Sequence, residues 1–254
     1  WLLSDAPIGH LVPWGGLAQW LEGQRDTLRP GRRLLLRRGD GQPLPEGFDG
    51  EGLVIEGRQA WIASEGRRSQ DRRARLIRID LASGQLQQEL PLPQAWRATP
   101  GQGLGSNKGP ESLTALAPGD LLLAAEAPLL QHQTEDGISL MRRAPGDALR
   151  TAGALDVGAA GRHDGLTELL ALPTRQLLLG LRRGFAPPDQ WTARLQLFAV
   201  PDPQGPPLQP IIGWDLLETG LPPDNWEAMA LGPVLSDGRQ TLVSVSYTHL
   251  RAHE

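Results

Sequence analysis

The chain has 254 residues, 39% of them apolar and 21% charged, and this balance excludes a disordered tail and a coiled coil. Its net charge of −4 does not indicate a nucleic-acid partner, and no apolar run approaches the roughly 18 residues of a membrane span. The absence of cysteine excludes disulfides, thiol nucleophiles and cysteine-bound metals. Glycine (31) and proline (23) are spread along the chain, which favours many short elements joined by turns over long helices.

A repeat organises the sequence. Four glutamates, Glu51, Glu111, Glu168 and Glu227, follow one another at spacings of 60, 57 and 59 residues, and an apolar strand, a turn and a second strand come after each of the first three. Units of four short strands at this period are typical of propeller blades. We therefore predict an all-β fold, a β-propeller of four-stranded blades of about 60 residues each.

The predicted units follow in chain order. The segment Trp1-Leu2-Leu3-Ser4-Asp5 matches the strand Trp61-Ile62-Ala63-Ser64-Glu65, so the chain is expected to begin inside a blade. The expected units are a partial blade at 1–46, blades at about 47–104, 105–161 and 162–220, and a partial blade at 221–246.

The chain is expected to be a fragment of a larger propeller of about six blades. Residues 247–254 resemble translated adapter sequence and are expected to be a non-native tail. The intact protein is expected to be a monomer, whereas two open sheet edges in this chain predict aggregation.

The repeat glutamates are predicted to face other side chains across each hairpin. The numbering centres Glu51 and Glu65 on the turn at Gly57-Arg58, and Glu111 and Glu126 on the turn at Pro118-Gly119. In the third unit the same rule places Glu168 opposite Arg182, which predicts an ion pair.

Two carboxylates opposite each other repel unless a cation, a shared proton or an arginine offsets the charge. Oxygen ligands of this kind suit Ca²⁺ best. The candidate metal ligands are Glu51, Glu65, Glu111, Glu126 and Glu227. The alternative, that these glutamates only connect the blades, stays open.

Rare residue types lie beside the repeat glutamates. The only lysine, Lys108, and the two asparagines, Asn107 and Asn225, precede Glu111 or Glu227 by two to four residues. A lysine can meet a phosphate, and an asparagine can supply a carbonyl ligand or an amide donor. We expect Asn107, Lys108, Asn225 and Arg182 to bind substrate, and Glu111, Glu227 and Lys108 to act in catalysis.

The motifs resemble a known family, the phytase-like propellers described as "esterase-like activity of phytase". The matching stretches, in order along the chain, are Asp49-Gly50-Glu51-Gly52-Leu53, Trp61-Ile62-Ala63-Ser64-Glu65-Gly66, Arg75-Leu76-Ile77-Arg78-Ile79-Asp80, Asn107-Lys108-Gly109-Pro110-Glu111-Ser112-Leu113, Arg183-Gly184-Phe185 and Asn225-Trp226-Glu227-Ala228-Met229-Ala230. The resemblance implies a secreted or periplasmic propeller with a phosphoester hydrolase activity. Two positions depart from the family pattern, Arg182 before Arg-Gly-Phe and Tyr247 after the last strand, where the family has acidic residues.

Three functions are therefore consistent with the sequence. The first is a Ca²⁺-assisted hydrolase that acts on a small phosphoester. The second is a non-catalytic propeller that binds a ligand or a partner. The third is a Ca²⁺-dependent lactonase or esterase, which would use similar ligands on a similar frame.

Overall fold

The structure is a computed structural model that describes residues 1–4, 8–44, 48–66, 73–132, 137–158 and 164–246. The expectation about the tail at 247–254 falls outside these residues. The helical elements are short, and they are α1 (Leu17–Leu21) and three 3₁₀ turns, η1 (Gln94–Trp96), η2 (Leu130–His132) and η3 (Pro173–Arg175). Within the described part of the chain, no helix has the length and apolar character of a membrane span.

Three four-stranded antiparallel sheets form the centre of the molecule. The first holds β6 (Gly50–Glu56), β7 (Gln59–Ser64), β8 (Arg75–Asp80) and β9 (Leu86–Pro91). The second holds β10 (Pro110–Ala117), β11 (Asp120–Ala125), β12 (Gly137–Arg143) and β13 (Arg150–Asp156). The third holds β14 (Asp164–Leu172), β15 (Leu177–Ala186), β16 (Gln190–Ala199) and β17 (Ile212–Asp215).

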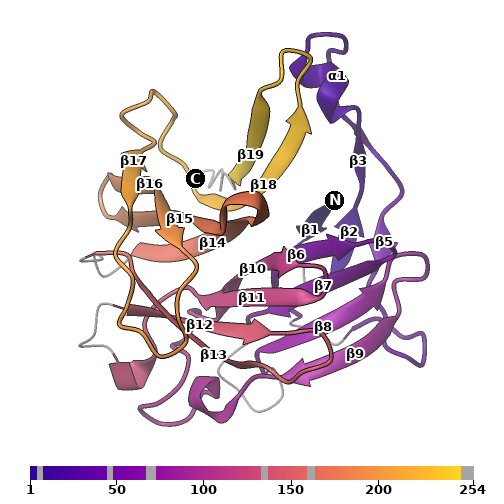
Figure 1. Ribbon diagram of the computed structural model, residues 1–254. Coiled ribbons are helices and arrows are strands. Elements are labelled where there is room, and N and C mark those ends of the chain that lie inside the picture. Colours follow the sequence, from indigo (N-terminus) through magenta and orange to yellow (C-terminus); the bar gives the residue numbers. More distant parts are fainter. Residues whose placement is uncertain (5–7, 45–47, 67–72, 133–136, 159–163, 247–254) are drawn as a thin grey trace.

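Smaller sheets flank these three. On the N-terminal side, β1 (Leu2–Ser4), β2 (His10–Val12) and β5 (Leu34–Leu35) form one sheet, and β3 (Trp14–Gly15) pairs with β4 (Arg29–Pro30). On the C-terminal side, β18 (Trp226–Val234) pairs with β19 (Gln240–Ser246). The amide of Ser236, at the tip of this hairpin, donates to Glu22 beside α1 over 2.7 Å, so the hairpin contacts the segment between β3 and β4 (Figure 1).

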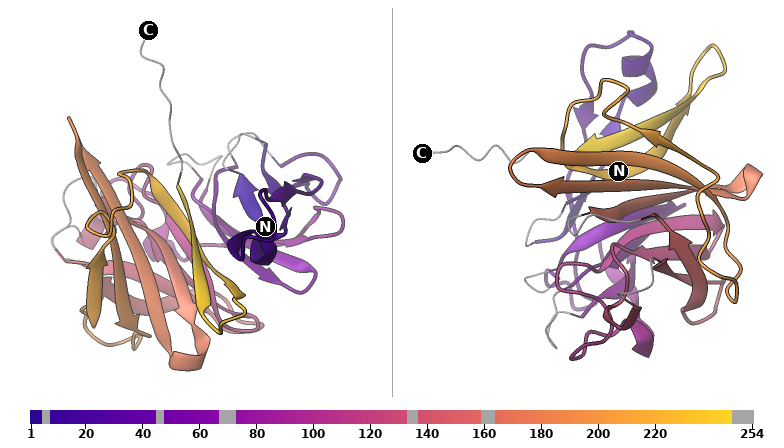
Figure 2. Two further views of the ribbon diagram at one scale, coloured as in Figure 1. Left: turned by 90° about the horizontal axis from the view of Figure 1, so that it is seen from above. Right: turned by 90° about the vertical axis from the view of Figure 1, so that its left-hand side faces the viewer.

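The sheets are arranged as the blades of a propeller. The first strands β6, β10, β14 and β18 lie next to one another in sequence order at the centre, and each sheet runs outward from its first strand (Figure 2). The predicted fold class, an all-β propeller with four-stranded blades, is confirmed.

The apolar core lies between neighbouring blades. β11 shows how one strand serves two interfaces, because Leu121 and Leu123 pack against the blade of β6, whereas Leu122 and Ala124 pack against the blade of β14. Successive side chains of a strand point to opposite faces of its sheet, so the run of buried residues in β11 produces this arrangement. The blades are thus fixed relative to one another, and so are the chain segments at their ends.

Candidate functional site

A β-bulge interrupts the start of every central strand. Glu51, Glu111, Thr167 and Glu227 each lie at the register shift that follows the first residue pairs of β6, β10, β14 and β18. A bulge adds one residue to one strand and changes the direction in which its side chain points. The true repeat position is therefore this bulge, and in the third blade Thr167 occupies it.

The bulges correct the predicted hairpin pairs. The amide of Glu65 bonds to the carbonyl of Asp49 over 2.9 Å, and the amide of Glu126 bonds to that of Gly109, also over 2.9 Å. Glu65 and Glu126 thus pair with residues two positions before Glu51 and Glu111, and neither of these glutamates is directly opposite its expected partner. The predicted numbering assumed a regular ladder, which an inserted residue breaks.

The third blade differs from its prediction in the same way. Arg182 pairs with Leu166 in the ladder, and Glu168 pairs with Leu181, so these two residues are not opposite each other. Arg182 forms an ion pair with Asp164 over 2.7 Å and donates to the carbonyl of Val157. The residue that corresponds to Glu65 and Glu126 is Arg183, which pairs with Gly165.

Five acidic side chains gather where the first two blades meet. Carboxylate oxygens of Asp49, Glu51 and Glu65 lie within 4.8 Å of one another, and so do those of Glu65, Glu111 and Glu126. We call these five residues the carboxylate cluster. Four of the five predicted metal ligands belong to it, and Glu65 belongs to both groups.

Asp49 was missing from the sequence prediction. It precedes the matched glutamate by two residues in Asp49-Gly50-Glu51, so its acidic type next to the repeat was a usable signal. The bulge at Glu51 explains how two carboxylates from one strand end reach the same group.

Burial and mutual repulsion make the cluster hard to ionise completely. Burial raises the pKa of Glu65 to about 7, and the amide of Gly109, which donates to Glu65 Oε1 over 2.6 Å, offsets only part of this effect. Burial also raises the pKa of Glu111 well above its usual range, and the charge of Glu51 adds to this shift. Full ionisation therefore requires a compensating cation.

Two cationic side chains adjoin the cluster. Lys108 Nζ lies 2.6 Å from Glu126 Oε1, so the only lysine neutralises one member of the second group. Arg183 opposes the raised pKa of Glu111 and forms an ion pair with Glu227 over 3.3 Å. Both of these cations thus lie beside the second group, Glu65, Glu111 and Glu126.

The remaining predicted site residues lie around the cluster rather than in it. Glu227 accepts hydrogen bonds from the side chains of Asn225 and Arg183, and among the described residues its carboxylate is not close to two other acidic or histidine side chains as a metal site would require. Asn107 has a positive φ of 53° and lines a cavity together with Glu65. Lys108 is therefore the predicted substrate-binding residue that directly contacts the cluster.

Glycines leave room for the carboxylates. A Cβ at Gly109 would overlap the side chain of Glu65 and approach its Cα to 2.9 Å, and a Cβ at Gly165 would overlap the carboxylate of Glu126. Glu65 and Glu126, which directly follow the second strands β7 and β11, thus pack against the start of the next blade. A residue larger than glycine does not fit at the contacted position.

We expect Gly109→Ala to lower the free energy of unfolding by about 1 to 3 kcal/mol, because Glu65 and its backbone would have to move. Urea denaturation at pH 7 measures this loss. Gly39→Ala, which meets no atom within 4 Å and, like Gly109, has no positive φ, controls for the loss of glycine itself. Equal losses in the two variants would contradict the packing explanation.

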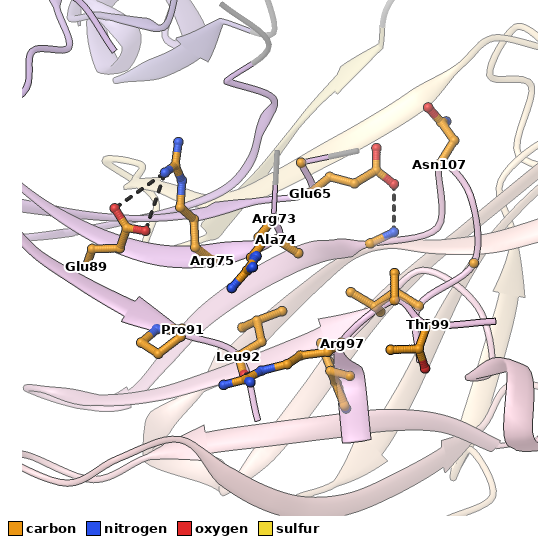
Figure 3. A pocket seen from close by; sticks show the side chains of 16 residues that line it. Glu65, Arg73, Ala74, Arg75, Glu89, Pro91, Leu92, Arg97, Thr99 and Asn107 are labelled. Atoms are coloured by element: carbon orange, nitrogen blue, oxygen red, sulfur yellow. Dashed lines mark hydrogen bonds and ion pairs between the residues drawn. The ribbon is translucent and has the colours of Figure 1, made fainter. Parts of the chain in front are cut away.

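A cavity of about 380 Å³ lies beside the cluster (Figure 3). Glu65 belongs to its wall, together with Asn107 and Gly109. Arg73, Arg75 and Arg97 line it from two chain segments, and Figure 3 shows Arg73 and Arg97 on the side away from Asn107. Sequence reasoning missed these arginines as site residues, since they do not repeat from blade to blade.

The solved structures to which this chain is similar are distant ones. No curated protein matches the chain. Among solved structures, a hypothetical selenium-binding protein from Sulfolobus tokodaii is 12% identical at a TM-score of 0.42, with 80% of this chain and 46% of that one covered. A member of the duf4221 family from Bacteroides vulgatus is 9% identical at a TM-score of 0.47, with 87% and 72% covered. The chain thus spans about half the length of the first of these structures.

A family model gives the assignment. The model of the phytase-like family, described as "esterase-like activity of phytase", matches residues 13–246. This range includes the four bulges, the carboxylate cluster and the cavity. The chain belongs to the phytase-like family.

Proposed function

We propose that this propeller is a Ca²⁺-assisted hydrolase of small phosphoesters. The observation that carries the proposal is the carboxylate cluster, in which five acidic side chains share a small, partly buried space beside a cavity lined by arginines. The family description, which names an esterase-like activity, supports the same reaction class.

The donor set suits the metal. Asp49, Glu51 and Glu65 offer hard carboxylate oxygens, the ligand type that Ca²⁺ prefers. The raised pKa values of Glu65 and Glu111 are the expected result of placing such groups together without a cation. A bound Ca²⁺ would neutralise phosphate oxygens and polarise the phosphorus.

Other residues of the chain would hold charge, transfer a proton and orient the substrate. Lys108 pairs with Glu126 and places a positive charge beside the second group. Glu111, whose pKa is raised, is suited to hold or accept a proton at its carboxylate. Asn107 lies where the cavity meets the cluster, and there it would orient a bound anion.

Glu227 and Asn225 are assigned a supporting role. They bond to each other, and Arg183 connects them to Glu111. Arg182, which is bonded to Asp164, would act on the frame of the third blade rather than on substrate. The secreted or periplasmic location implied by the resemblance fits weak Ca²⁺ sites, since Ca²⁺ is abundant outside the cytoplasm.

Thermal melting with and without millimolar Ca²⁺ tests the metal site. We expect Ca²⁺ to raise the Tm of the wild type by several degrees and to leave that of Glu111→Gln almost unchanged, because the variant removes one central carboxylate. Glu218→Gln, a change at an exposed glutamate, should keep the full shift.

Hydrolysis of p-nitrophenyl phosphate in Ca²⁺ and in EGTA tests the reaction. Turnover that requires Ca²⁺ and falls at least a hundredfold in Glu111→Gln is expected. A Ca²⁺ shift without turnover of p-nitrophenyl phosphate, but with turnover of p-nitrophenyl acetate or a lactone, would replace the phosphoester by a carboxylic ester. No shift and no turnover would favour the non-catalytic binding propeller.

A further inference from the structure

The hairpin of β15 and β16 in the third blade is longer at one end than its counterparts. β7 and β11 end at Ser64 and Ala125, directly before Glu65 and Glu126. β15 instead continues for three residues past Arg183, the residue that corresponds to these glutamates, and it stays paired with β16 to its last residue. The hairpin therefore projects beyond the neighbouring strands at the end of the propeller that holds the carboxylate cluster (Figure 2).

Two aromatic side chains contact each other near the tip of this hairpin. Phe185 lies directly opposite Trp191 in the ladder, and their ring centroids are 4.6 Å apart at an interplanar angle of 43°. We call these two residues the aromatic pair. Phe185 is 37% exposed and Trp191 is only partly buried, so the pair offers apolar ring surface to a ligand.

The two faces of the hairpin tip differ in what covers them. On one face, Arg182 forms an ion pair with Asp164, and a Cβ at Gly184 would overlap the carboxylate of the same aspartate. That face is therefore filled by the blade itself. Phe185 lies on the opposite face, because successive side chains of a strand alternate, and there it stays exposed.

The face that carries Phe185 is also the face that connects to the carboxylate cluster. Arg183 and Phe185 are two residues apart in β15, so their side chains lie on the same face, about 7 Å apart along the strand. Arg183 forms an ion pair with Glu227 over 3.3 Å, and its charge opposes the raised pKa of Glu111. The aromatic pair thus follows the cluster along one face of the hairpin.

We propose that the aromatic pair binds the ring of an aryl phosphoester whose phosphate lies at the carboxylate cluster. A planar ring can stack on the exposed surface of the pair, whereas a short alkyl group cannot, and stacking of this kind strengthens binding by about threefold to tenfold. The inference names the substrate class of the hydrolase, and it rests on the proposed function for the statement that Ca²⁺ at the cluster holds the phosphate.

Titration calorimetry in millimolar Ca²⁺ with phenylphosphonate and methylphosphonate tests the proposal. Both compounds present the same charged group, and their carbon–phosphorus bonds are not cleaved by phosphoester hydrolysis, so binding is measured without turnover. We expect the wild type to bind phenylphosphonate at least threefold more tightly than methylphosphonate. Equal affinities, or no binding of phenylphosphonate, would overturn the proposal.

Variants locate the preference for the ring. Phe185→Leu and Trp191→Leu keep an apolar side chain but remove a ring, so each should bring the two affinities closer together, and Phe185→Tyr should retain the wild-type ratio. Trp214→Leu, a change at an exposed tryptophan of β17, should also retain it. A wild-type ratio in both leucine variants would refute the role of the aromatic pair. A preference for phenylphosphonate without turnover of any phosphoester would instead contradict only the hydrolase function.

Discussion

Replacing Glu168 by alanine is expected to lower the free energy of unfolding by about 3 kcal/mol or more. The Glu168 carboxylate accepts hydrogen bonds from the amides of Leu169, Met229 and Leu113. These three amides belong to β14, β18 and β10, so one buried side chain joins three blades at the centre of the propeller.

The physical reason lies in the buried amides. Burial raises the pKa of Glu168 to about 8, which shows how dry its surroundings are. Alanine would leave the amides without this acceptor and would open a cavity among the central strands. Each unsatisfied buried amide costs about 1 to 3 kcal/mol, and the cavity adds to the loss.

Urea denaturation of Glu168→Ala at pH 7 measures the effect. Glu168→Gln keeps the volume and one acceptor and should lose less, and the exposed Glu218→Ala should change stability by no more than about 0.5 kcal/mol. A loss below about 1 kcal/mol in Glu168→Ala would show that water or another group serves the amides.

The repeat in the sequence was sufficient to predict the blades but not the local geometry of the site. Glycine and proline at turns and the spacing of Glu51, Glu111 and Glu227 indicate four-stranded units, since these signals are local. The formation of a bulge, in contrast, does not depend on neighbouring residues in the sequence alone. Whether a strand holds one extra residue depends on its partner strand, so Glu168 was aligned in place of Thr167.

The dependence on repeating sequence signals also explains which site residues the sequence predicted. Glu65 and Glu126 repeat from blade to blade, so the period revealed them. Arg73 and Arg97 occur once, in segments that only the folded blade brings together. A cavity that forms at the edge of a single blade leaves no periodic trace in the sequence.

The stability of the protein is expected to fall with rising pH in the absence of Ca²⁺ and to change much less when Ca²⁺ is bound. In EGTA, the wild type should become less stable as the pH rises from 5 to 8. The folded-state pKa of Glu65 is about 7 and its ordinary value is 4.5, so the unfolded chain releases this proton first. The stabilisation is complete below pH 4.5 and is lost as the pH rises through 7, by about 3 kcal/mol in total.

Ca²⁺ opposes this loss because it binds the ionised carboxylates that a rising pH provides. The gain in Tm from millimolar Ca²⁺ should therefore be small at pH 5 and large at pH 8. Glu65→Gln keeps an acceptor for the amide of Gly109 but cannot ionise, so both effects should shrink in this variant. Glu168, which titrates in the same direction with a pKa of about 8, is present in both proteins and cancels in the comparison. If Glu65→Gln retained the wild-type slope in EGTA and the wild-type Ca²⁺ gain at pH 8, then Glu65 would serve only to join the blades through Gly109, and the metal would have to be placed on other residues.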